Sequence, residues 1–146
     1  VTAANARKER DMKTITGTWY GQSGSRLELH LTHDGHIEGR YYTANNDEAQ
    51  GVFDLIGMSD TRAFGGSRSV GFVVCWNNEY VNQHSVTAWS GQYQIVNDEE
   101  VLATNWLLTR ETSPEHGWAA TMIGSDTFKR TPVAQPHATP ALENAP

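Results

Sequence analysis

From residue 14 onward, apolar and polar residues alternate in short runs that are separated by turn-forming residues. Residues 26–32, for example, place three leucines on one side of the chain and polar or charged residues on the other. Alternation with a period of two is typical of a half-buried β-strand, and the 3.6-residue period of an amphipathic helix is missing throughout. The pattern therefore predicts an all-β domain.

Eight runs of this kind follow one another at fairly even spacing, which is typical of a β-barrel or a β-sandwich. The predicted strands are residues 16–20, 26–32, 37–43, 52–58, 70–76, 84–93, 101–109 and 118–128. Between the second and third runs, Asp34 and Gly35 predict a tight hairpin with a two-residue type I′ turn. Because eight strands are enough to close a small barrel, a closed barrel is the expected fold.

The strand predicted over residues 84–93 places Ser85, Thr87 and Trp89 on one face. A plain core would not mix hydroxyls with an indole, because a buried hydroxyl without a partner costs roughly 1–3 kcal/mol. Neighbouring strands add two tryptophans and two polar groups to the same interior: Trp76, Trp106, Tyr41 and Asp126. Aromatic walls with a few fixed polar groups predict a small-molecule site, and a packed core whose hydroxyls bond to the backbone is the alternative.

The strand predicted over residues 70–76 is apolar on both faces. One face carries Phe72, Val74 and Trp76, and the other carries Gly71, Val73 and Cys75. Such a strand is expected to be covered on both sides, by the interior of the barrel and by a second subunit. Cys75 is the only cysteine, so it cannot form an intrachain disulfide, and its apolar surroundings predict a buried thiol.

Length and charge limit the class of protein. A chain of 146 residues predicts one domain, and a net charge of −6 without a basic block argues against nucleic acid as a partner. Apolar runs stay well short of the about 20 residues that a membrane-spanning helix needs, so a membrane partner is not expected. We expect residues 1–13 to be a flexible lead-in, residues 14–131 to form the barrel, and the Pro- and Ala-rich residues 132–146 to be a disordered tail.

Catalytic and metal chemistry find little support in the sequence. Three histidines flank the predicted hairpin turn, at His30, His33 and His36. They have no cysteine or acidic cluster at metal-ligand spacing beside them, so we expect no metal site. His84 and Ser85 are neighbours on a strand and point to opposite faces, so they cannot pair as base and nucleophile. We therefore expect a binding protein without a cofactor rather than an enzyme.

Several separate motifs carry a family resemblance over residues 15–132. They are Ile15-Thr16-Gly17-Thr18-Trp19-Tyr20, Trp76-Asn77-Asn78, His84-Ser85, Trp89-Ser90-Gly91-Gln92-Tyr93, Asn105-Trp106-Leu107-Leu108 and Gly124-Ser125-Asp126-Thr127-Phe128. In this order they resemble the avidin and streptavidin family of biotin-binding proteins, and most closely its streptavidin-like bacterial members. The resemblance implies an up-and-down antiparallel barrel of eight strands that binds biotin at one end.

The resemblance also implies a role for each matching residue. Ser25 and Tyr41 would donate hydrogen bonds to the ureido oxygen of biotin, and Asp126 and Thr43 would accept from its two ureido nitrogens. Thr87 would face the sulfur, and the bicyclic ring would lie between Trp76, Trp89, Trp106 and Leu108. The valerate carboxylate would be met by Ser85 and by the backbone of the loop that contains Asn45. Trp118 would close the pocket of a neighbouring subunit, which favours a homotetramer, with a dimer as the alternative.

Gly21 departs from the family pattern, in which an asparagine donates to the ureido oxygen. The loss of one donor to a polarised oxygen should cost about 1.5–3 kcal/mol, so we expect biotin binding that is weaker than in streptavidin and is strengthened by Gly21→Asn. Two other readings remain open: a lipocalin-like carrier of another small ligand, and a structural or adhesive module with a degenerate biotin site. The resemblance also implies a secreted or periplasmic location.

Overall fold

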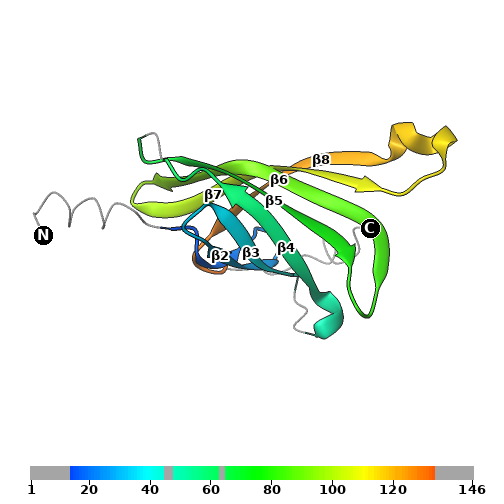
Figure 1. The fold of residues 1–146 in the computed structure, drawn as a ribbon, viewed down its shortest axis with the longest axis horizontal. Helices are drawn as coiled ribbons and strands as arrows, with labels where there is room; N and C mark the ends of the chain where they lie inside the picture. Colours follow the sequence, from blue (N-terminus) through cyan, green and yellow to red (C-terminus); the bar gives the residue numbers. More distant parts are fainter. Residues whose placement is uncertain (1–13, 45–47, 63–64, 134–146) are drawn as a thin grey trace, which may run out of the picture.

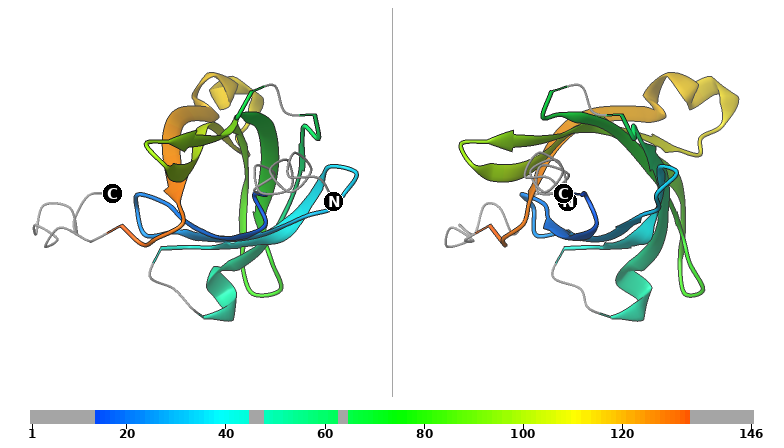
Figure 2. Two further views of the ribbon diagram at one scale, coloured as in Figure 1. Left: turned by 90° about the vertical axis from the view of Figure 1, so that its left-hand side faces the viewer. Right: turned by 60° about the vertical axis from the view of Figure 1, so that its left-hand side comes forward.

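Eight strands follow one another around a closed barrel in the computed structural model, which describes residues 14–44, 48–62 and 65–133 (Figure 1). The strands are β1 Gly17–Tyr20, β2 Arg26–Leu31, β3 His36–Tyr42, β4 Val52–Ser59, β5 Arg68–Asn77, β6 Asn82–Val96, β7 Glu99–Arg110 and β8 Thr121–Lys129. Each strand pairs in antiparallel fashion with the next, and β8 pairs with β1, so the strands form the ring seen in Figure 2. The predicted fold class is confirmed. The expectations for residues 1–13 and 134–146 concern positions outside the described residues.

The interior of the barrel is filled by the inward-facing residue of each alternating pair. In β2, Leu27 and Leu29 are buried and Leu31 is partly buried, which confirms the predicted face. The largest buried side chains of the core are Trp19, Phe53, Phe72, Trp76, Trp89, Tyr93 and Phe128. At about 25 cal/mol per Å² of apolar surface, such aromatic side chains dominate the hydrophobic stabilisation of the fold.

The seam between β1 and β8 is short, because Tyr20 and Lys129 are the one register pair that joins these strands. Arg130 reinforces this seam from the end of β8. Its guanidinium lies 3.8 Å from the centre of the Trp19 ring and donates hydrogen bonds to the carbonyls of Thr14, at 2.7 Å, and Thr16, at 3.2 Å. It also donates to the carbonyl of Thr18 at 3.3 Å, so a cation that packs on an indole and binds three carbonyls closes this end of the barrel.

The hairpin between β2 and β3 differs from the prediction. Gly35 has a φ of +91° and its N–H donates to the carbonyl of Thr32 at 3.1 Å, whereas Asp34 is not in the left-handed region. The loop is therefore a three-residue loop in which a type I turn is followed by a left-handed glycine, and the predicted type I′ turn is wrong. A loop with the geometry of type I′ occurs instead between β6 and β7, where Asn97 and Asp98 have φ values of +51° and +63°.

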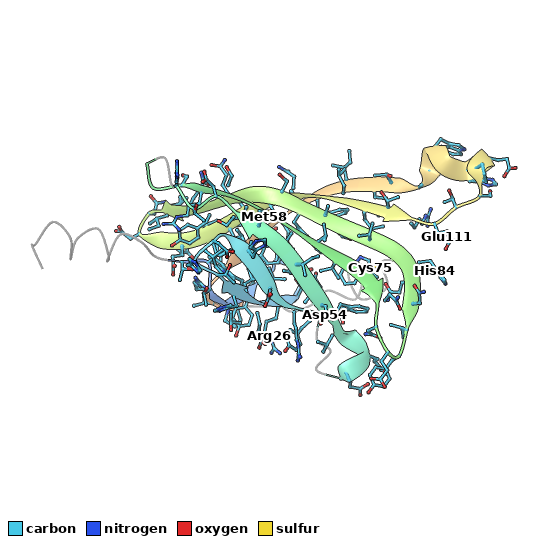
Figure 3. All side chains as sticks on the ribbon, in the orientation of Figure 1. Arg26, Asp54, Met58, Cys75, His84 and Glu111 are labelled. Carbon is cyan, nitrogen blue, oxygen red and sulfur yellow. The ribbon has the colours of Figure 1, made fainter. Side chains whose placement is uncertain are left out.

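Two further predictions need correction. Cys75 is exposed on the outside of β5, as Figure 3 shows, because the inward positions on either side of it belong to Val74 and Trp76. The predicted buried thiol is therefore wrong for the single chain. Trp118 lies not in a strand but in the short 3₁₀-helix η2, Pro114–Ala119, because the fixed φ of Pro114 suits the start of a helix and the N–H of Ala120 donates to the carbonyl of Gly117 at its end. Figure 1 places η2 (yellow) at the tip of the β7–β8 connection, away from the ring of strands.

The two loops beside the mouth of the barrel are tied down by backbone and amide hydrogen bonds. A second 3₁₀-helix, η1 Ala49–Gly51, ends the loop after β3, and the N–H of Thr43 donates to the carbonyl of Gly51 at 2.9 Å. From the β5–β6 loop, the Asn78 amide donates to the carbonyl of Val52 at 2.9 Å. Within the described ranges, no helix is long and apolar enough to cross a membrane.

Candidate ligand-binding site

A pocket of about 240 Å³ opens at the end of the barrel where β1, β3, β5 and β7 end. It is lined by Ser23, Ser25, Tyr41, Thr43, Ala44, Trp76, Gln83 and Leu108. Five of these residues were predicted from the sequence as site residues: Ser25, Tyr41, Thr43, Trp76 and Leu108. The structure thus brings together side chains from four strands and two loops that are far apart in the sequence.

Aromatic rings form a rigid wall of this pocket. The Tyr41 ring packs edge-on against Trp76, with centroids 5.0 Å apart, and is stacked on Trp89 at 5.4 Å with an angle of 28° between the ring planes. Behind them, Phe53 and Phe72 contact the two indoles at 5.1 Å each. Because Tyr41, Trp76 and Trp89 each contact two or more other rings, the wall offers a preformed apolar surface to a flat ligand.

Thr87 lies behind the wall and fixes one of its indoles. It is buried, and its hydroxyl oxygen accepts a hydrogen bond of 2.8 Å from Nε1 of Trp76. The predicted inward face of Thr87 and Trp89 is therefore confirmed. A hydroxyl that accepts through its oxygen keeps its own proton to donate, so Thr87 orients Trp76 and retains one donor.

A polar corner, formed by Ser25, Tyr41 and Asp126, lies beside the aromatic wall. Ser25 is 1% exposed, and its hydroxyl has no hydrogen-bond partner among the described residues. Burial raises the pKa of Tyr41, and the Asp126 carboxylate raises this pKa further. The nearby Ser25 hydroxyl partly opposes the rise, although the two hydroxyls do not have the geometry of an ordinary hydrogen bond. A buried hydroxyl without a partner is costly in the free protein, which favours a ligand that supplies one.

Asp126 is held by the backbone rather than by a side chain. The N–H of Gln22 donates to its Oδ1 at 3.1 Å. Burial raises the pKa of Asp126, and the backbone N–H groups of Gln22 and Thr127 partly oppose the rise. The carboxylate is therefore fixed in place while it is partly shielded from water, which strengthens any hydrogen bond that it accepts from a ligand.

Gly21 is buried against this corner. A β-carbon at position 21 would lie 2.4 Å from Oγ of Ser25 and 3.0 Å from Oδ2 of Asp126. The Ser25 hydroxyl thus occupies the space that a side chain at position 21 would need. Any residue larger than glycine must displace this hydroxyl, which is possible because Oγ turns about a single bond.

The remaining predicted site residues that the structure describes are not among those that line the pocket. Ser85 is partly buried and on the inward face of β6, and Trp106 packs over Gly124, where a β-carbon would come within 2.1 Å of the indole. Neither lines the pocket directly. Trp118 is 84% exposed and is not among the residues that line the pocket. Asn45 lies outside the described residues.

Sequence reasoning missed three residues that line the pocket. Ser23 and Ala44 belong to loops, and Gln83 lies at an irregularity of the β5–β6 pairing. Alternation does not extend into the loops of Ser23 and Ala44, whereas Gln83 has the parity of Ser85 and Thr87 but precedes the strand predicted from residue 84.

The histidines of the β2–β3 hairpin remain apart from this site. His36 lies 3.7 Å from the Asp34 carboxylate at an exposed turn. Across the described residues, no group of three or more His, Cys, Asp or Glu side chains has the arrangement of a metal site.

A closed antiparallel barrel with an aromatic-walled pocket and a buried polar corner at one end defines a small-molecule-binding β-barrel. Comparison with known families narrows this class. The model of the Avidin family matches residues 9–131, and the chain belongs to that family.

Two bacterial relatives carry avidin-type names. Afifavidin of Afifella pfennigii is 28% identical over 116 residues, which cover 78% of this chain and 67% of the relative. Hoefavidin of Hoeflea phototrophica is 30% identical over 108 residues, which cover 67% of this chain and 63% of the relative. The chain thus spans about two thirds of the length of these relatives. Fibropellin-1 of Strongylocentrotus purpuratus is 26% identical over 117 residues, which are 11% of its length.

Proposed function

We propose that this protein binds biotin noncovalently in the pocket at the mouth of the barrel. The observation that carries the proposal is the buried Ser25 hydroxyl, which has no partner and lies beside Tyr41 and Asp126 next to a wall of indoles. Biotin has a ureido group whose oxygen accepts and whose nitrogens donate, attached to an apolar bicycle. Its two halves match the polar corner and the aromatic wall.

The polar corner suits the ureido group because the two sides reinforce each other. Hydrogen bonds from Ser25 and Tyr41 to the oxygen draw negative charge onto it, and the positive charge left on the nitrogens is met by the Asp126 carboxylate. Such coupled hydrogen bonds are stronger than isolated ones in a site that excludes water. Thr43 lines the same pocket, and its hydroxyl is the second acceptor in this proposal.

We also propose that the absent side chain at Gly21 weakens this binding. Asparagine at position 21 adds a donor but must displace the Ser25 hydroxyl, so Gly21→Ala is the matched control that introduces the β-carbon alone. We expect Gly21→Asn to bind biotin more tightly than Gly21→Ala by about 1.5–3 kcal/mol in calorimetry. Equal affinities of the two variants would refute the role of the missing donor.

Retention on biotin-agarose with release by free biotin, followed by calorimetry, tests the function itself. A lipocalin-like carrier would prefer an apolar ligand, so free biotin would not release it from the biotin-agarose. A structural module with a degenerate site would fail to bind at micromolar protein. The buried polar corner favours biotin over a lipid, because a lipid leaves the Ser25 hydroxyl unpartnered.

An apolar row on the outside of the barrel supports self-association. Ile56, Val73, Ala88, Leu107 and Ile123 are consecutive register partners across β4 to β8. Ile56, Leu107 and Ile123 are 62%, 49% and 78% exposed. A row of this kind on a sheet face favours packing against another sheet.

We propose that copies of this chain pack on this row and that the exposed Trp118 reaches the pocket of a neighbour, giving a homotetramer rather than a dimer. Light scattering measures the mass. Leu107→Asp should reduce it, because the charge would be buried between subunits. His30→Asp places the same charge on the polar outer face of β2 and should leave the mass unchanged. An unchanged mass in Leu107→Asp would refute the interface.

Membership of the avidin family also leads us to propose a secreted or periplasmic location and a binding role rather than catalysis. Fractionation of the source cells with an antibody to the chain tests the location. Recovery of the protein in the cytoplasm would refute it.

A further inference from the structure

The rim of the pocket carries a polar side chain that the proposed ureido contacts do not use. Gln83, at the start of β6, lines the pocket together with Ala44 and Leu108. Its side chain is exposed, and across the described residues no hydrogen bond involves it. The amide therefore has two N–H donors and one carbonyl acceptor available at the mouth of the barrel.

An irregularity of the β5–β6 ladder gives Gln83 this position. Cys75 pairs with Val86, but the next pair is Asn77 with Asn82, so the three residues 83–85 lie opposite Trp76 alone. Bulges of this kind occur at the rims of barrels and next to binding sites, where they redirect side chains. Within this bulge, Gln83 lines the pocket and Ser85 is partly buried on the inward face of β6.

The bulge is held in place from outside the barrel. His84, at its centre, has a φ of +50°, which is uncommon for a residue other than glycine. Its N–H donates to Oδ1 of Asn82 at 2.9 Å, and its carbonyl accepts from the N–H of Glu111 at 2.8 Å. Its Nδ1 also lies 3.1 Å from Oε2 of Glu111, and Figure 3 shows the two side chains next to each other. Backbone strain that is held by several contacts is typical of ligand sites.

The order of strands places Gln83 across the mouth from the polar corner. β6 and β2 are four strands apart in either direction around the closed ring of eight. Ser25 immediately precedes β2, and Gln83 is the second residue of β6. Ser25 and Gln83 line the same pocket, so a ligand that spans it from Ser25 to the opposite side of the barrel can contact Gln83.

We propose that Gln83 hydrogen-bonds the acyl end of the biotin side chain, and that it accepts a carboxylate and an amide alike. This inference rests on the proposed function. An uncharged amide donates to either oxygen of a carboxylate, and it can donate to the carbonyl of an amide while accepting from its N–H. None of the residues that line the pocket is a cation, so the acyl end does not need to be charged.

The experiment compares two ligands that differ only at this end: biotin and its N-methylamide. Gln83→Glu keeps the size of the side chain but replaces the donor by a second carboxylate. We expect calorimetry at neutral pH to show about tenfold or greater weakening for biotin, because of lost donation and like-charge repulsion, and less than about threefold for the N-methylamide. Gln92→Glu makes the same change on the outer face of β6 and should alter neither affinity, at an unchanged mass by light scattering.

The outcomes separate the two levels of the proposal. Wild-type protein that binds both ligands with similar affinity, together with a selective loss for biotin in Gln83→Glu, supports the role of Gln83. Equal losses for both ligands, or no loss for either, would overturn that role and leave biotin binding intact. If the wild-type protein bound neither ligand, both the biotin assignment and the role of Gln83 would be overturned.

Discussion

Replacing Ser25 by alanine should separate the stability of the barrel from its binding function. The Ser25 hydroxyl is buried at 1% exposure and makes no hydrogen bond with any described residue. Ser25→Ala removes this hydroxyl and keeps the β-carbon. The same atom is, in the proposed complex, a donor to the ureido oxygen. One substitution should therefore affect the free protein and the complex in opposite directions.

The magnitudes follow from the burial of that atom. An unpartnered buried hydroxyl costs about 1–3 kcal/mol, and the small space left by its removal costs about 1 kcal/mol, so the ligand-free variant should be about 0–2 kcal/mol more stable. A gain of 1 kcal/mol raises the Tm by about 2–8 °C over domain sizes that bracket this chain. The complex loses a hydrogen bond worth about 1.5–3 kcal/mol, which weakens biotin binding about 10- to 150-fold.

Thermal unfolding without ligand and calorimetry with biotin are the two assays. Both should be run at one protein concentration, because self-association makes the Tm concentration-dependent. Ser23→Ala is the control for stability, since Ser23 is exposed and the loss of an exposed hydroxyl should change the free energy of unfolding little. A lower Tm for ligand-free Ser25→Ala than for Ser23→Ala would show that the hydroxyl is bonded in the free protein. Unchanged biotin affinity would show that Ser25 is not a donor.

Three further predictions follow. Burial raises the pKa of Asp126 above its ordinary 3.8, and the ionised carboxylate accepts a stronger hydrogen bond from the ureido group than the protonated acid does. The affinity for the N-methylamide of biotin, a ligand that does not titrate, should therefore be full above the raised pKa and should fall as the pH drops through it. Asp126→Asn should abolish this pH dependence in calorimetry. Arg130→Ala should destabilise the folded protein by about 2–4 kcal/mol in urea unfolding, because the carbonyls and the Trp19 ring lose their cation. The number of biotin molecules bound per chain at saturation, measured without urea, should stay unchanged. Cys75 should react slowly with maleimide in the wild-type assembly and faster in Leu107→Asp, and equal rates would count against burial of the outer face of β5.

The regular part of the fold could be predicted from the sequence because period-two alternation reports directly on an inward and an outward face. This holds for Leu27 and Leu29, and for Thr87 and Trp89, all of which are buried as predicted. The predicted ends of the strands lie close to the observed ends, because the alternation stops where each strand ends. Cys75 shows where this reasoning fails: the hydrophobicity of a run does not say which residues face the interior of a single chain.

The irregular part could not be predicted because it depends on contacts between distant segments. The predicted type I′ geometry of the β2–β3 turn was wrong because the Asp-Gly pair is compatible with more than one loop type. Gln83 reaches the pocket through a bulge that is held by Glu111, a residue on another strand connection. The close approach of the Ser25 hydroxyl to Gly21 is likewise visible only in three dimensions.

Gly21 and Ser25 are two parts of one arrangement, and this changes the meaning of the missing asparagine. The Ser25 hydroxyl lies where a β-carbon at position 21 would be, and the backbone N–H of Gln22 donates to the carboxylate of Asp126. The proposed complex would lack one donor, but its formation would give a partner to a hydroxyl that has none among the described residues. Since the second effect opposes the first, the net loss of affinity caused by glycine should be smaller than the about 1.5–3 kcal/mol of a single lost donor.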